Sequence, residues 1–284
     1  AHDVGTRADR VDAVLGRLRA GSTFIPGPDA LGWIDQVLPI ARDLDDPDRL
    51  AALYERAIWT RGMQGEGYAN KAYREQLDEA YALMPTLRQT ATAALLQALW
   101  ATAQRSVDAF DESLEPLAAA VDALERSGEL ANASEFSTML ADSFAELGRF
   151  SEASAAIDRA PQLAALSGDL NAAADADLIR GSIAAERGDL DEAIDYLKRG
   201  VDGAQDVGNT FCDLVGSFKV ADQQLRMGNA EAAIGHLEHS AGLARYCNAG
   251  GYEALGQAWL AAARARLGDL RPQDFDAPLE HAVA

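Results

Sequence analysis

Two histidines are the first residues in this sequence whose spacing could support chemistry. His236 and His239 stand three residues apart in GHLEHS, which places both imidazoles on one face of a predicted helix. Paired histidines can hold a metal ion, but the pattern is not H-E-x-x-H and still needs a third ligand from elsewhere. We therefore predict a solvent-exposed outer helix face here, with a metal site completed by another helix as the alternative.

A glycine-rich segment, GMQGEGYANK at residues 62–71, combines G-x-G with a nearby lysine, as phosphate-binding loops do. It lacks G-K-[ST] and follows no predicted strand, so neither nucleotide-binding fingerprint applies. We predict a turn between helices, and the alternative is a local insertion that shapes a ligand site.

Other short motifs fail for similar reasons. The acidic run DLDDPDRL at residues 43–50 lacks the central glycine and the distal glutamate of a calcium loop. No serine, histidine and aspartate spacing indicates a nucleophile elbow. Arg187-Gly188-Asp189 spells a tripeptide that could act as an adhesion signal in an extracellular loop. The sequence therefore predicts no catalytic, metal or cofactor site.

Composition indicates a folded helical protein. The chain has 284 residues, 48% of them hydrophobic and only 7% aromatic, and its isolated glycines and prolines favour packed helices over sheets. The 45 acidic against 25 basic residues give a net charge of −20, which disfavours binding to nucleic acid or to an anionic membrane surface.

Targeting signals and disulfide patterns point to the cytoplasm. No stretch approaches the roughly 18 apolar residues that span a bilayer, and the N-terminus has no apolar signal core. Cys212 and Cys247 are predicted to be buried thiols in a reducing compartment, although a bridge between them is conceivable. Because no initiator Met is present, we expect a fragment of a longer chain, with an effector domain elsewhere.

Glycines recur with a fixed period that explains the tripeptide at residue 188. Gly148, Gly188, Gly228 and Gly268 are 40 residues apart, and a second series lies midway, at Gly128, Gly168 and Gly208, with Asn248 in the next place. Glycine and asparagine tolerate the left-handed conformation that ends helices. The pattern predicts helices of about 16 to 18 residues, and Gly188 is predicted to be one of their stops.

Apolar columns repeat with the same period. Small residues recur on the first helix of each predicted pair, at Ala101, Ala141, Gly181, Ala221 and Ala261. Large apolar residues recur on the second helix, at Leu77, Leu117, Ile157, Leu197 and Leu237, each followed three places later by a small residue. Close helix packing requires a small residue on one helix opposite a large residue on the other, at the point where the two helices cross.

These columns, with G-D-x-x-E-A at the turn, resemble the tetratricopeptide repeat (TPR), whose usual length is about 34 residues. The longer repeat is similar to those of bacterial maltose-regulator-like (LuxR-type) transcription activators and of the C-terminal regions of some class III adenylate cyclases. The resemblance, carried mostly by residues 208–269, implies an all-α superhelix of about seven antiparallel helix pairs with a concave groove.

The resemblance divides the chain into four segments of one continuous solenoid. Residues 128–270 form regular repeats and residues 46–127 degenerate ones, where Asp108 replaces a turn glycine. Residues 1–45 are expected to form divergent or capping helices, and residues 271–284 a C-terminal capping helix.

The resemblance also implies which residues line the groove. They are Glu135, Thr138, Asp142, Asp175, Leu178, Ser182, Phe218, Asp222 and Arg226. Acids with interspersed apolar groups suit a ligand that carries basic and apolar groups. The same register would bury Asp177 and Arg180, a conflict that a rotation of the helix or an ion pair could relieve.

The function implied is a non-catalytic module that binds a protein, a peptide or a small effector. It would be the sensory or interaction part of a larger bacterial signalling or transcription regulator. The alternative is a free-standing scaffold for protein assembly, and a third class, an enzyme with a site inside a helical bundle, would need a metal or cofactor.

Overall fold

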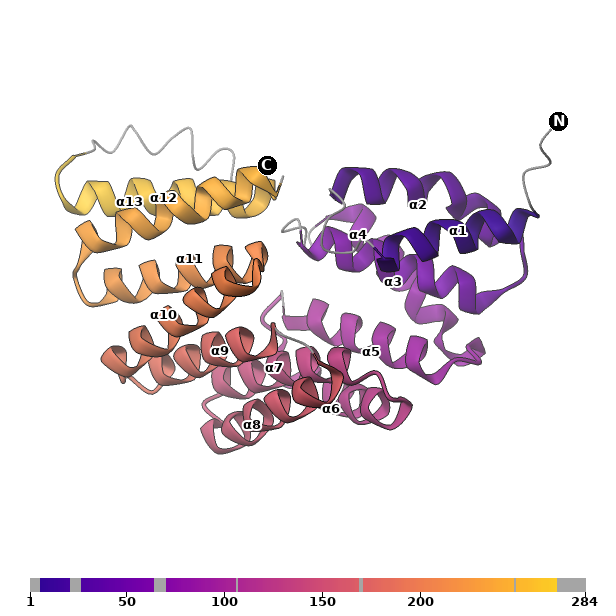
Figure 1. Ribbon diagram of the computed structural model, residues 1–284, viewed down its shortest axis with the longest axis horizontal. Helices are drawn as coiled ribbons and strands as arrows, with labels where there is room; N and C mark the ends of the chain where they lie inside the picture. The colour runs from indigo at the N-terminus through magenta and orange to yellow at the C-terminus, as the bar shows by residue number, and fades with distance from the viewer. Residues whose placement is uncertain are drawn as a thin grey trace. The chain divides into compact units, whose positions relative to one another are not determined.

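Every regular element that the structure describes is helical (Figure 1). The computed structural model describes residues 6–20, 27–63, 70–105, 107–168, 171–247 and 249–269. Within these ranges no helix is both long enough and apolar enough to cross a membrane. The all-α prediction is confirmed, while the expected helix at 271–284, the stop at Asn248 and most of the glycine-rich segment lie outside the described residues.

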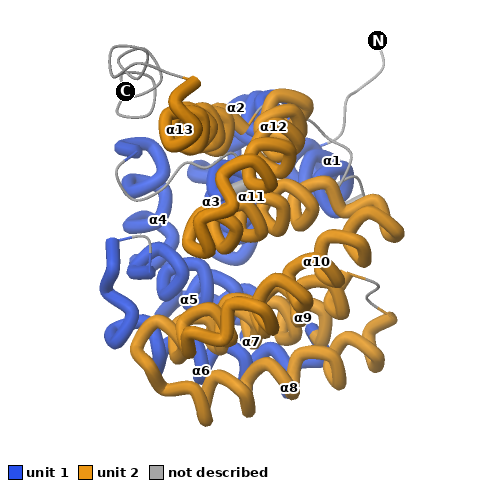
Figure 2. Tube along the Cα trace, turned by 90° about the vertical axis from the view of Figure 1, so that its left-hand side faces the viewer, with its two compact units in different colours: residues 1–129 blue, residues 130–284 orange. Residues whose placement is uncertain are grey.

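The chain divides into two units, residues 1–129 and residues 130–284 (Figure 2). In unit 1 the helices pack in consecutive pairs, the first with the second, the third with the fourth and the fifth with the sixth. The first helix of each pair also contacts the first helix of the next pair. Its helices are α1 (Arg7–Ala20), α2 (Gly27–Arg42), α3 (Pro47–Met63), α4 (Lys71–Leu83), a 3-10 turn (Met84–Thr86), α5 (Thr90–Arg105) and α6 (Phe110–Ser127).

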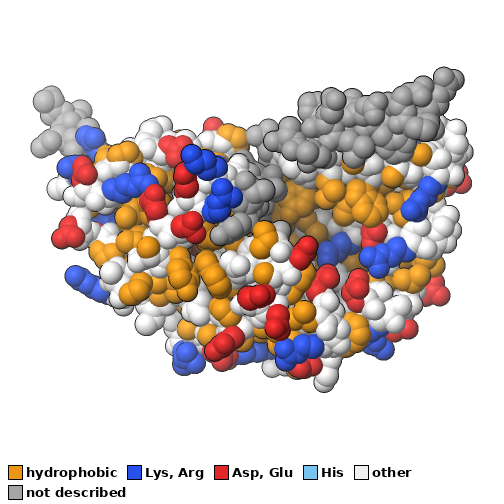
Figure 3. Space-filling model, turned by 180° about the vertical axis from the view of Figure 1, so that it is seen from behind, with side chains coloured by type: hydrophobic (Ala, Val, Ile, Leu, Met, Phe, Trp, Pro, Cys, Tyr) orange, Lys and Arg blue, Asp and Glu red, His pale blue; other side chains and the backbone are white. Residues whose placement is uncertain are grey.

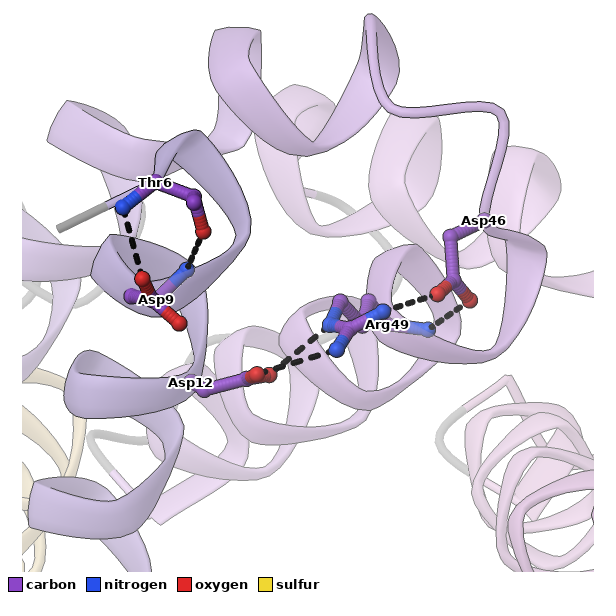
Figure 4. A network of polar contacts seen from close by, with 5 residues as sticks. All are labelled: Thr6, Asp9, Asp12, Asp46 and Arg49. Atoms are coloured by element: carbon purple, nitrogen blue, oxygen red, sulfur yellow. Dashed lines mark hydrogen bonds and ion pairs between the residues drawn. The ribbon is translucent and has the colours of Figure 1, made fainter.

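A polar network fixes the start of unit 1 (Figure 4). Thr6 and Asp9 form a reciprocal cap at the start of α1, each backbone N–H bonded to the other's side chain. The Arg49 guanidinium donates two hydrogen bonds, of 2.8 and 3.0 Å, to the Asp12 carboxylate, and this pairing lowers the pKa of Asp12. Arg49 also binds Asp46, so it joins α1 to α3 and to the turn before α3.

Unit 2 arranges its helices in two rows. The first helices of the pairs are α7 (Leu130–Glu146), α9 (Ala172–Glu186), α11 (Thr210–Arg226) and α13 (Gly250–Arg266). The second helices are α8 (Phe150–Ser167), α10 (Leu190–Val207) and α12 (Ala230–Tyr246), and they lie on the opposite side of the unit (Figure 2). Each second helix also contacts the first helix of the next pair. Continuity of the array across the two units stays a prediction.

The helices end where the glycine period predicts. Left-handed backbone occurs at Gly128, Gly148, Gly168, Gly188, Gly208, Gly228 and Gly268. At Gly188 φ is 86°, and this residue lies in the turn between the end of α9 and the start of α10. The tripeptide that contains Gly188 therefore marks the end of a helix. Asp108, which replaces a turn glycine, also takes positive φ, at 61°. An aspartate tolerates this conformation at some cost, which explains how the period persists there.

The predicted columns form the core of the pairs. The large apolar column and the small column opposite it are buried throughout. Gly181 on α9 shows why the small column is needed, because a Cβ there would lie 2.6 Å from Cγ of Leu197 and 3.0 Å from the carbonyl oxygen of Ala193 on α10. The backbone of α9 therefore approaches α10 more closely than any residue with a side chain allows.

Gly181→Ala should lower the free energy of unfolding by about 1–3 kcal/mol, because α9 and α10 must separate to admit the methyl group. Gly235→Ala on α12 is the matched control, since a Cβ at Gly235 meets no atom within 4 Å. That substitution should raise the free energy of unfolding by about 0.5–1 kcal/mol through helix propensity. Urea unfolding of both variants measures the two values, and effects of the same sign would contradict the close approach at Gly181.

Candidate binding face

The exposed side of the row α7, α9, α11 and α13, here called the first-helix face, carries the candidate site. Figure 3 views this side, and over unit 2, on the right, apolar side chains gather beside basic and acidic ones. The predicted groove residues that reach the face are Glu135, Asp142, Asp175, Ser182, Phe218 and Asp222, all half-buried, and Arg226, which is exposed.

Two predicted groove residues lie in the interior instead. Leu178 is only 4% exposed, because its side chain fills the space that Gly200 on α10 and Gly216 on α11 leave open. Thr138 is 6% exposed, and its hydroxyl donates to the backbone carbonyl of Glu135 at 2.6 Å. The prediction that Leu178 and Thr138 line an open groove is therefore wrong.

A row of polar contacts, here called the polar seam, joins α9 to α11 on this face. The Cys212 thiol donates to the Asp175 carboxylate at 2.6 Å, and the Lys219 ammonium donates to the Ser182 hydroxyl at 2.6 Å. The two contacts are seven residues apart on each helix, which is close to two helical turns and keeps them on one face. Successive first helices thus meet through polar groups here.

The seam ends in an ion-pair group. Arg226 lies 3.0 Å from the Asp222 carboxylate on its own helix and 3.6 Å from the Glu186 carboxylate on α9. From α13, Arg266 reaches back to the carbonyl oxygen of Leu225 at 3.0 Å. The Asp222 and Glu186 carboxylates neutralise the charge of Arg226 locally.

Aromatic rings, here called the aromatic seam, join α11 to α13. Phe211 meets Tyr252 with ring centroids 5.6 Å apart, and Phe218 meets Trp259 at 5.3 Å. Both pairs are edge-to-face, at 81° and 76°, and both are again seven residues apart on each helix. Edge-to-face contact is a favourable geometry for aromatic pairs.

Helix α11 therefore has a polar edge toward α9 and an aromatic edge toward α13. In the adjacent pairs Phe211–Cys212 and Phe218–Lys219, the aromatic residue turns to α13 and the polar residue turns to α9. A ligand on this face would meet polar groups on one side of α11 and half-buried rings on the other.

Phe218 is among the residues predicted from the sequence, but its partner Trp259, the second aromatic pair and Lys219 are not. A signal was present, because the aromatic partners are 41 residues apart in both pairs and the polar partners are 37 apart in both. An offset of 41, just above the period of 40, links one edge of α11 to α13, and an offset of 37, just below it, links the other edge of α11 to α9.

Of the two histidines on α12, His239 contacts α11. His239 is exposed, and its Nε2 atom lies 3.0 Å from both oxygens of the buried Asp213 carboxylate. His236 is half-buried, and burial together with the Lys198 charge lowers its pKa. In the part of the chain that the structure describes, no three His, Cys, Asp or Glu side chains are placed to hold a metal ion.

Ion pairs resolve the conflict at Asp177 and Arg180. Arg180 lies 3.4 Å from Asp177 and 3.2 Å from Asp158 of α8, and Arg199 of α10 lies 3.3 Å from Asp177. Both residues are half-buried, and their charges are paired.

Comparison with known proteins agrees with this architecture. No family model matches the sequence, and no curated protein matches it. Among solved structures, a Rap protein complexed with competence and sporulation factor has a TM-score of 0.68 and 12% identity, over 98% of this chain and 76% of that one. The fold is of the TPR type.

Two further structures share this TPR-type fold. A signal transduction ATPase with numerous domains (STAND) from Pyrococcus horikoshii, which has a tetratricopeptide repeat sensor, matches with a TM-score of 0.58 and 12% identity, over 98% of this chain and 41% of that one. A tetratricopeptide repeat protein from Parabacteroides merdae matches with a TM-score of 0.50 and 12% identity, over 98% and 99% of the two chains. At such identity the likeness shows the fold alone.

Iodoacetamide should label Cys212 slowly in the folded protein at about pH 8, where an ordinary thiol is partly ionised. Burial raises the pKa of Cys212, and the Asp175 carboxylate raises it further. Asp175→Asn removes that charge and should speed the labelling of Cys212 by about three- to tenfold, because more thiolate forms.

Cys247, which is also free and whose pKa is raised by burial, serves as the internal control. Mass spectrometry after timed labelling gives both rates in one sample. A rise for both cysteines would indicate general loosening, and no rise at Cys212 would contradict the thiol–carboxylate contact.

Proposed function

We propose that unit 2 is a binding module that takes a protein or peptide segment on its first-helix face. The observation that carries this proposal is the pair of seams, which place half-buried rings and hydrogen-bonding groups side by side outside the core columns. Surfaces that combine aromatic anchors with polar groups are typical of interaction sites. The Rap protein of similar fold was solved as a complex with competence and sporulation factor, which supports a binding role for this architecture.

The setting we propose is the sensory or interaction part of a larger bacterial signalling or transcription regulator. The STAND protein supports it, because there a TPR sensor belongs to a signal transduction ATPase. Occupation of the face would bias the angles between stacked pairs, since a helical array distributes a small rotation over many interfaces, and an effector domain elsewhere would respond.

A free-standing scaffold is the second candidate. It is favoured by the Parabacteroides merdae tetratricopeptide repeat protein, whose solved chain is covered over 99% of its length by this chain. Thermal-shift screening with metabolites separates the two candidates, because a sensor of small effectors should be stabilised by one of them and a scaffold should not.

A random peptide library displayed on phage tests the binding role directly. Peptides enriched on the wild-type protein should lose affinity for Trp259→Ala by about tenfold or more, as expected for a central aromatic anchor. Tyr246→Ala is the matched control, because Tyr246 is an 83%-exposed aromatic residue on the second helix α12.

Affinities are measured by fluorescence anisotropy, and circular dichroism confirms that both variants are folded. Selected peptides that respond to Tyr246→Ala and not to Trp259→Ala would place binding on the opposite side of the unit and overturn the proposal.

A further inference from the structure

The charge on the first-helix face changes in one direction along the row. On α7 every charged residue is acidic, and its face residues are Glu135 and Asp142. On α9 the carboxylates of this face are Asp175, which accepts from the Cys212 thiol, and Glu186, whose charge is paired with Arg226. Helix α11 carries both signs there, and α13 contributes Arg266. The row thus runs from acidic to mixed to basic.

The acids at the α7 end act on the same surface as the seams. The charges of Asp175 and Glu135 both raise the pKa of the Cys212 thiol on α11, so the field of an α7 carboxylate reaches across to the polar seam. In a chain with a net charge of −20, this field attracts cationic groups to the α7 and α9 end of the face.

The apolar groups lie at the other end. The aromatic seam belongs to α11 and α13, and Leu255 beside it on α13 is 40% exposed. Neither α7 nor α9 has an aromatic pair on the face among the described residues. An apolar group of a ligand would therefore lose most contact with water over α11 and α13.

Lys219 separates the two ends. Its ammonium is bound to the uncharged hydroxyl of Ser182, whereas Arg226 has Glu186 and Asp222 as partners. The positive charge at Lys219 disfavours a basic ligand group over α11, so basic groups are kept to the acidic end.

On the basis of the proposed function, we propose that the occupant of this face is an extended peptide with a basic part over α7 and α9 and an apolar or aromatic part over α11 and α13. Neighbouring packed helices are about 8–10 Å apart, so a row of four spans roughly 25–30 Å. An extended peptide rises about 3.3 Å per residue, so about eight residues cover the row.

The test uses fluorescein-labelled synthetic peptides of about eight residues, the length that spans the row at about 3.3 Å per residue. In two probes one half is Arg and Lys and the other half Leu and Phe, with the basic half first or last. A third probe replaces the basic half by Asp and Glu, and a fourth alternates basic and apolar residues. At least one block probe should bind the full chain with higher affinity than the charge-reversed and alternating probes.

The variants locate each half of the bound probe. The double variant Glu135→Gln, Asp142→Asn should weaken the block probe by about three- to tenfold and flatten the salt dependence of binding. Trp259→Ala should also weaken it but leave the salt dependence unchanged. The double variant Glu192→Gln, Asp195→Asn is the control, because it makes the same charge change at exposed positions on the second helix α10.

The outcomes separate this inference from the proposed function. If the charge-reversed probe binds better and its affinity falls with Trp259→Ala, the face binds peptides and the inference is overturned. Equal weakening by the α7 and α10 variants would mean non-specific charge attraction and would also overturn it. If no probe and no library peptide responds to any variant of the first-helix face, the proposed function itself fails.

Discussion

Close approach between the two helices of each pair is the constraint on which the other features depend. At Gly181 the backbone of α9 lies so near Leu197 and Ala193 of α10 that a methyl group has no space. The same small-against-large column recurs every 40 residues in the four pairs from α5 to α12, so these pairs share a crossing point. Because the crossing point is fixed, so is the rotation of each helix about its axis. That rotation decides which residues face neighbours and which face solvent.

The seams follow from that fixed rotation. On a helix set in one orientation, two adjacent residues point about 100° apart, so Phe211 and Cys212 turn toward different neighbours. Two turns later Phe218 and Lys219 repeat the arrangement. The packing columns thus place a second set of residues, outside the core, in straight rows along the first helices. The sequence there is free to vary in chemistry, which is how one edge of α11 is polar and the other aromatic.

The all-α repeat fold and the helix ends of the regular repeats could be predicted from the sequence, because their determinants are local. A glycine with positive φ ends a helix wherever it stands, and the buried columns repeat at a fixed interval. The site was harder to predict, because the exposure of a residue depends on how much space the side chains of neighbouring helices leave for it. Leu178 occupies a groove position by register, yet it is buried because Gly200 and Gly216 leave space for it. Ion pairing at Asp177 likewise depends on side chains from two other helices.

Stability alone gives a weak reason for the two seams. A partly exposed polar contact such as that between Lys219 and Ser182 contributes about 0–1 kcal/mol, and an edge-to-face aromatic pair about 0.5–1.5 kcal/mol. The core columns bury whole leucine side chains, each contributing about 1.5–3 kcal/mol, and already hold the helices together. Trp259, left half-buried, forgoes part of the gain that full burial would give it. A ligand that covers this ring would recover that gain, and this is the physical reason for the proposed binding role.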